Sequence, residues 1–211
     1  MPITPAIFPE LITAIDDIIK QNADAVTELD QAIGDGDHVF NLQRGLQALH
    51  TASTEISQLD WPAAWQKIGM VLMASVGGAS GSLYATLFIS LSKNSLNKNL
   101  DLQTFADSFA LAIEAVKQRG KSDIGEKTML DVLVPVAKSL KAATQANQDL
   151  TASLTQICQA AEDGVENTRN LLATKGRASF LGERSLGHID AGAKTAQLMI
   201  VAIVKVLKEQ L

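Results

Sequence analysis

Three aspartates lie close together near the N-terminal end of the chain. Asp30, Asp35 and Asp37 fall within eight residues of one another, and Gly34 and Gly36 separate them. The two glycines allow the backbone to turn tightly enough for the three side chains to face the same space. Carboxylates gathered in this way repel one another unless a cation neutralises them, and Mg²⁺ prefers oxygen ligands that it often shares with phosphates. The spacing therefore predicts a magnesium site.

A second interpretation of the same loop needs no metal. An acidic turn with Asp37 or His38 at its end can cap the helix that follows. The loop also differs from an EF-hand, which requires a longer run of alternating ligands that ends in a glutamate. From these residues alone, both the metal site and the capping turn remain open.

Three further segments combine small residues with charged residues. Residues 75–82 are rich in Gly and Ser, and a helix that begins there would offer free N–H groups to an anion. The same residues also suit a plain turn between closely crossing helices. Residues 119–131 contain Asp123, Glu126 and Thr128, any of which could cap the helix that follows. Residues 175–193 contain three lysines and arginines and one histidine among glycines, which suits phosphate binding. The four segments together favour a shared site for a nucleotide and a metal.

The elements between these segments read as helices. Apolar residues recur at three- and four-residue spacing along most of the chain, which is typical of amphipathic helices. Pro135 predicts a kink or a local break in one helix, and Asp101 and Asp190 are suited to cap others. The predicted helices cover residues 6–29, 38–50, 61–76, 80–93, 101–120, 127–145, 150–174 and 191–211. We therefore expect a single all-α domain over residues 1–211, with its functional residues in the loops.

Composition agrees with tightly packed helices. The 211 residues are 46% hydrophobic but only 4% aromatic, and the formal net charge is -5. This charge argues against a nucleic-acid partner. No apolar run is long enough to span a bilayer, and residues 1–5 lack the pattern of a signal peptide, so we expect a cytoplasmic protein. The single cysteine, Cys158, excludes an internal disulfide and suits a place in the core better than a role as a nucleophile.

Four motifs, taken in order, resemble one known family. They read L-D-x-x-I-G-D-G-D-H-x-x-N-L-x-R-G, S-V-G-G-A-S-G-S-L-Y, R-G-K-x-x-x-G-E-K-T-M-L-D-V and K-G-R-A-S-F-L-G-E-R-S-L-G-H-x-D-A-G-A. Together they resemble the nucleotide-binding L subunit of dihydroxyacetone kinase, and they span nearly the whole chain. The resemblance implies an eight-helix antiparallel barrel whose loops at one end bind ADP or ATP with two Mg²⁺ ions.

The resemblance also implies a set of site residues. Asp30, Asp35 and Asp37 would be the magnesium ligands. The nucleotide would contact His38, Val39, Phe40, Asn41, Ala79, Ser80, Gly120, Met129, Arg177, Asp190, Ala191 and Gly192. His188 falls in the last motif, so we expect it near the site, whereas His50 reads as an exposed residue at a helix end.

In this family the L unit is either fused to a substrate-binding K domain or made as a separate protein. The motifs fill this chain, so the resemblance favours the separate subunit. A phosphohistidine-donor M subunit would then phosphorylate the bound ADP, and the γ-phosphoryl group would pass to dihydroxyacetone held by the K subunit. Two alternatives remain: a related kinase with another acceptor, and an ADP-dependent protein that docks on a transcription regulator. The sequence leaves the oligomeric state open, including a homodimer.

Overall fold

A computed structural model describes residues 3–211. Met1 and Pro2, which begin the stretch where we expect no targeting segment, lie outside the described range. Within that range the chain is helical, without a β-strand, so the all-α fold class is confirmed. None of the helices in the described part is both long enough and apolar enough to cross a membrane.

Nine α-helices and two short 3₁₀ segments make up residues 3–211. The α-helices are α1 (Phe8–Gln21), α2 (Ala23–Ile33), α3 (His38–Ser57), α4 (Trp61–Ser75), α5 (Gly78–Ser95), α6 (Leu102–Gly120), α7 (Leu130–Gln145), α8 (Leu150–Thr168) and α9 (Ala191–Glu209). The 3₁₀ segments are η1 (Pro5–Ile7) and η2 (Arg177–Ser185). The boundaries of α4 and α6 agree closely with the sequence prediction.

The first predicted helix is divided in two at Asn22. The backbone of Asn22 leaves the helical region, and its side-chain amide donates to the carbonyl of Ile18 at 2.8 Å. Apolar periodicity continues through this position, which is why the sequence predicted one helix over 6–29. The seventh predicted helix also ends early, at Thr168 rather than near residue 174. In α7, by contrast, the helix continues through Pro135 without a break.

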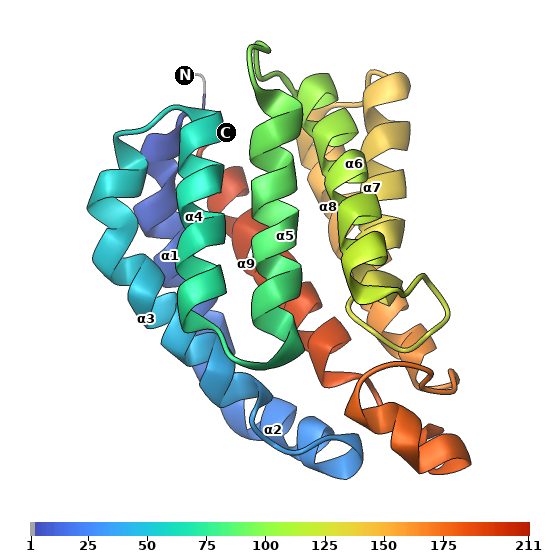
Figure 1. The fold of residues 1–211 in the computed structure, drawn as a ribbon. Coiled ribbons are helices and arrows are strands. Elements are labelled where there is room, and N and C mark those ends of the chain that lie inside the picture. The colour runs from blue at the N-terminus through green and yellow to red at the C-terminus, as the bar shows by residue number, and fades with distance from the viewer. Residues whose placement is uncertain (1–2) are drawn as a thin grey trace.

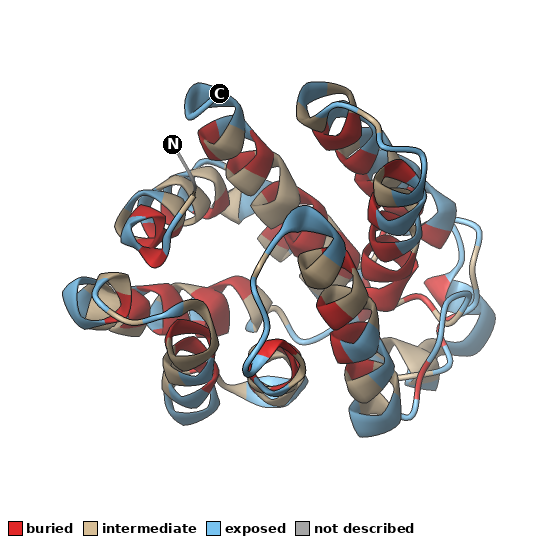
Figure 2. Cartoon of the chain, turned by 90° about the horizontal axis from the view of Figure 1, so that it is seen from above, coloured by how far each residue is buried: buried red, intermediate tan, exposed pale blue. Residues whose placement is uncertain are grey.

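From α3 to α9, successive helices run in alternate directions (Figure 1). Each helix from α3 to α9 contacts the next one along the chain, and α1 contacts both α3 and α9. The contacts therefore follow a closed circuit of α1 and α3 to α9, with α2 extending from it at one end. Their buried faces point inward, as Figure 2 shows, and bury residues such as Trp65, Ile113, Val132 and Val165.

The alternation brings the start of every second helix to the same end of the molecule. The N-termini of α3, α5, α7 and α9 lie at the end where α2 projects (Figure 1). The helices α4, α6 and α8 begin at the opposite end, and each is capped by an aspartate side chain (Asp60, Asp101 and Asp149). Neither α3 nor α5 is capped by the side chain at its N-cap position. The first N–H of α3 donates to the carboxylate of Asp30, whereas the first N–H groups of α5 remain available for another acceptor.

Candidate functional site

A cavity of about 540 Å³ opens among these helix N-termini. Thirteen of the fifteen residues predicted from sequence line it: Asp30, Asp35, Asp37, His38, Asn41, Ala79, Ser80, Gly120, Met129, Arg177, Asp190, Ala191 and Gly192. They come from four segments that are far apart in the sequence. The fold therefore brings the four motifs together around a single space.

Val39 and Phe40 do not line this cavity. Val39 is buried in a small apolar cluster with Leu46 and Leu198, and Phe40 is 67% exposed to solvent. The reason is helical geometry, because residues three apart, such as His38 and Asn41, share a face, while the two between them point elsewhere. His188 is exposed and does not line the cavity. Its backbone carbonyl, rather than its ring, makes the contact near the site by accepting a hydrogen bond from Lys127.

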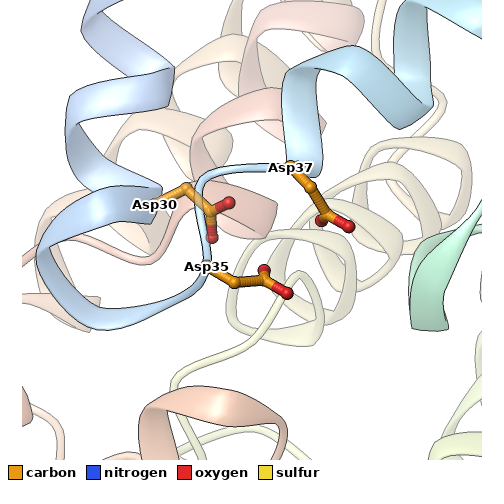
Figure 3. A group of neighbouring side chains, drawn as sticks. All are labelled: Asp30, Asp35 and Asp37. Atoms are coloured by element: carbon orange, nitrogen blue, oxygen red, sulfur yellow. The ribbon is translucent and has the colours of Figure 1, made fainter.

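The three aspartates converge as the loop sequence predicts. One carboxylate oxygen from each of Asp30, Asp35 and Asp37 lies within 4.8 Å of the others. Asp30 is on the last turn of α2, Asp35 is in the loop and Asp37 precedes α3, and their carboxylates project to the same side of the loop (Figure 3). Gly36 permits the turn because its φ of 77° lies in the left-handed region, which a side chain disfavours.

The carboxylate of Asp37 does not cap α3. Asp37 occupies the N-cap position, yet its side chain accepts no hydrogen bond from the helix. The carboxylate of Asp30 accepts a hydrogen bond of 3.2 Å from the backbone N–H of His38 instead. The ligand atoms that the three carboxylates offer to a metal are all oxygens. Oxygen ligands fit a hard divalent cation better than a transition metal that prefers nitrogen or sulfur. The acidic turn thus binds the first N–H of α3 through Asp30, and its three carboxylates also lie close enough together to share a cation.

The loop before α5 lies very close to α3. Gly77 lies against Asn41, and a Cβ atom at Gly77 would come within 2.3 Å of the Asn41 side-chain oxygen. Only glycine therefore allows α3 to approach the loop before α5. Ala79 and Ser80 follow in the first turn of α5, where uncapped N–H groups and the helix dipole favour a negative ligand.

The other part of the cavity is apolar. Leu83, Val116, Met129 and Leu130 line it, and Met129 is almost fully buried. Gly120 lies beside Leu83, since an added Cβ would come within 3.3 Å of the Leu83 side chain. A cavity with a metal and phosphate region at one part and an apolar region at another matches the two parts of a nucleotide.

Charged residues at one wall of the cavity hold that wall in place. The ammonium of Lys127 is buried and donates to the backbone carbonyls of Thr168 at 2.6 Å, Leu171 at 3.4 Å and His188. Burial lowers the pKa of Lys127. These bonds give a charged donor to carbonyls at and just after the end of α8, where helical partners run out. Lys127 was not singled out from the sequence, although it lies inside the third motif.

Asp131 and Asp190 complete this wall. The carboxylate of Asp131 accepts hydrogen bonds from the backbone N–H groups of Gly125 at 2.6 Å and Thr128 at 2.7 Å, and burial raises its pKa. Asp190 caps α9 by accepting from the N–H of Ala193 at 2.7 Å. Burial raises the pKa of Asp190 to about 7. The cap at Asp190 agrees with the sequence prediction.

His50 does not lie at a helix end. It is within α3, half-buried, and its Nε2 lies 3.1 Å from a carboxylate oxygen of Asp16 on α1. The sequence prediction of an exposed helix-end residue is therefore wrong. Cys158 is half-buried and packs against the main core, as expected.

Comparisons with known proteins identify the family of this chain. The family model described as the DAK2 domain matches residues 32–205. The chain is 40% identical to "PEP-dependent dihydroxyacetone kinase 1, ADP-binding subunit DhaL" of Listeria innocua, over 89% of each chain. It is 36% identical to "PEP-dependent dihydroxyacetone kinase, ADP-binding subunit DhaL" of Escherichia coli, over 94% of this chain and 95% of that one.

A solved structure shares the fold. The dihydroxyacetone kinase from C. freundii, determined in complex with AMP-PNP and Mg²⁺, superposes with a TM-score of 0.72 at 22% identity. The superposition covers 97% of this chain and 34% of that one, so the fold corresponds to one part of a longer protein. With a family model that covers most of its length, this chain belongs to the DAK2 domain family.

Proposed function

We propose that this chain is the ADP-binding subunit of a phosphoenolpyruvate-dependent dihydroxyacetone kinase, with residues 1–211 as a single L-type domain. The observation that carries the proposal is the meeting of three carboxylates with the uncapped N-terminus of α5 at one cavity. The names of relatives that align with nearly the whole chain support the choice of reaction.

Asp30, Asp35 and Asp37 hold two Mg²⁺ ions in this proposal. Their oxygen atoms suit the metal, and the cluster lies beside the N-terminal turn of α5, where phosphates would bind. Bound Mg²⁺ offsets negative charge on the phosphate oxygens during transfer. Arg177 adds a cation from the segment between α8 and α9.

The remaining cavity residues position the nucleotide. Backbone N–H groups at Ala79 and Ser80, and at Ala191 and Gly192, bind the phosphates, because each pair lies in the first turn of a helix. Met129 gives the base an adaptable apolar contact. Phosphoryl transfer requires position and charge neutralisation more than covalent help, and these residues supply both.

The transfer requires two partner proteins. A phosphohistidine-donor M subunit phosphorylates the bound ADP to ATP. The γ-phosphoryl group then passes to a hydroxyl of dihydroxyacetone on the K subunit, which leaves ADP in place. Two exposed aromatic side chains, Phe40 on α3 and Phe180 on η2, support docking at the cavity end, since exposed apolar residues often mark interfaces. We place the reaction in the cytoplasm.

The test follows bound nucleotide through one cycle. The purified chain is expected to retain ADP and Mg²⁺ near one nucleotide per protein, and labelled ADP should exchange more slowly than phosphoryl transfer proceeds. Adding phosphorylated M subunit should convert the bound ADP to ATP, and adding K subunit with dihydroxyacetone should return it to ADP. Steady phosphorylation of dihydroxyacetone from free ATP by the chain alone would contradict the proposal, as would an absence of Mg·ADP binding.

A further inference from the structure

The ring of His38 lies between three helices that surround the cavity. His38 itself begins α3, its Nδ1 lies 3.3 Å from the Ser80 hydroxyl of α5, and its Nε2 lies 2.9 Å from the Thr195 hydroxyl of α9. The backbone N–H of His38 also binds Asp30, one of the three clustered aspartates. One side chain thus contacts both helix N-termini assigned to the phosphates and adjoins the metal loop.

The direction of each hydrogen bond follows from one fixed acceptor. The hydroxyl of Thr195 lies 3.1 Å from the backbone carbonyl of Gly192, which can only accept, so Thr195 donates its single hydrogen there. Nε2 of His38 must then donate to Thr195. In a neutral imidazole Nδ1 is left as an acceptor, and Ser80 donates to it.

We propose that His38 is a positioning residue of the nucleotide site, which holds the first turns of α5 and α9 at a fixed separation through Ser80 and Thr195. Both ring nitrogens are engaged, so the imidazole serves as neither a general base nor a phosphoryl carrier. The chain Ser80–His38–Thr195–Gly192 ends on the backbone of α9 beside the N–H groups assigned to the phosphates. This inference rests on the function proposed above.

Thr195 offers a test that does not touch the ligand. It is fully buried and does not line the cavity, so its substitution reaches the nucleotide site through α9 and through the side chains it neighbours, His38 and Tyr84. Thr195→Val keeps the shape but removes the hydroxyl, and we expect the affinity for Mg·ADP to fall about fivefold to tenfold, the equivalent of one neutral hydrogen bond. Binding is measured by titration calorimetry at a temperature where both proteins are folded.

Thr195→Ser is the matched control. It keeps the hydroxyl but loses a buried methyl group, so it should lower the melting temperature while it binds Mg·ADP nearly as the wild type does. If affinity simply followed stability, the Ser variant would bind as weakly as the Val variant. That result, or equal affinity of the Val variant and the wild type, would overturn the inference.

A second measurement needs no substitution. With only three histidines in the chain, ¹⁵N-labelled imidazoles can be assigned individually by NMR. At neutral pH we expect His38 to carry its proton on Nε2, with Nδ1 bare, and a proton on Nδ1 alone would overturn the chain of donors. Wild-type protein that fails to bind Mg·ADP would contradict the proposed function instead, so the two failures are distinct.

Discussion

The guanidinium of Arg177 lies 2.5 Å from the carboxylate of Asp35. Arg177 is on η2 and Asp35 is in the loop between α2 and α3, so this ion pair connects the segment after α8 to the aspartate loop. The pair occupies a carboxylate that we assign to magnesium. Arg177 therefore competes with a cation for Asp35 while the nucleotide is absent, and it is free to bind phosphates once the metal takes its place.

Arg177→Met should affect metal and nucleotide in opposite ways. Without nucleotide, Mn²⁺ used as a probe should bind about two- to fivefold more tightly, since an exposed ion pair contributes less than ~1 kcal/mol. The affinity for Mg·ADP should fall, because a phosphate contact is lost. Titration calorimetry measures both constants. Arg184→Met, on the same segment but outside the cavity lining, is the control and should change neither.

Asp37→Asn should weaken binding without affecting the empty protein. Asp37 is exposed and accepts no capping hydrogen bond, so its charge contributes little to the ligand-free fold. A ligand present at a thousand times its dissociation constant raises stability by roughly 4 kcal/mol, and most of this gain should disappear in the variant. Melting temperatures with and without Mg·ADP measure the effect. Asp24→Asn, on the exposed side of α2, should keep the full ligand-induced shift.

The aspartate loop could be predicted from the sequence because its ligands are near one another in the chain. Asp30, Asp35 and Asp37 need only a local turn to converge, and the glycines between them reveal that turn. Thr195 and Lys127 could not be found in this way. Thr195 acts through a ring 157 positions away along the chain, and Lys127 binds carbonyls 41 to 61 positions away. Such contacts exist only once the helices have packed.

The helix boundaries that the sequence misplaced lie where polar side chains bind carbonyls at helix ends. The Asn22 side chain donates to the Ile18 carbonyl in addition to the Asn22 backbone N–H, and Lys127 donates to the Thr168 carbonyl at the end of α8. Apolar periodicity records neither event, since it reports only which residues face the core. Helices that begin with an aspartate cap, such as α6 after Asp101, were placed correctly because the cap is itself a sequence signal.

Lys127→Met should loosen the wall that supports α9. The variant leaves the carbonyls of Thr168, Leu171 and His188 without their charged donor, and we expect a loss of roughly 2–4 kcal/mol in the free energy of unfolding. Chemical denaturation measures the loss. Lys67→Met removes an exposed ion pair with Glu55 and should cost less than ~1 kcal/mol. Equal losses of unfolding free energy in the two variants would show that the buried bonds of Lys127 stabilise the fold no more than an exposed ion pair does.

Asp190→Asn should remove a pH dependence of the ligand-free protein. Burial raises the pKa of Asp190 to about 7, so the folded state favours the protonated carboxyl. The stabilisation is complete below the unfolded pKa of about 3.9, and it is lost as the pH rises through 7. Wild-type protein should therefore lose roughly 1–3 kcal/mol through this group between pH 4 and 8, a range reduced from the full shift because the side chain borders the cavity.

The Asn variant keeps the cap, because its side-chain oxygen can still accept from Ala193, but it carries no charge to bury. Denaturation at a series of pH values should give a smaller decline for the variant than for the wild type, and the variant should be the more stable of the two at pH 8. Asp149 caps the N-terminus of α8, at the end of the molecule away from the cavity. Asp149→Asn therefore controls for the exchange of a carboxylate for an amide at an N-cap. Parallel pH profiles for wild type and Asp190→Asn would show that the charge of Asp190 is fully solvated through the cavity.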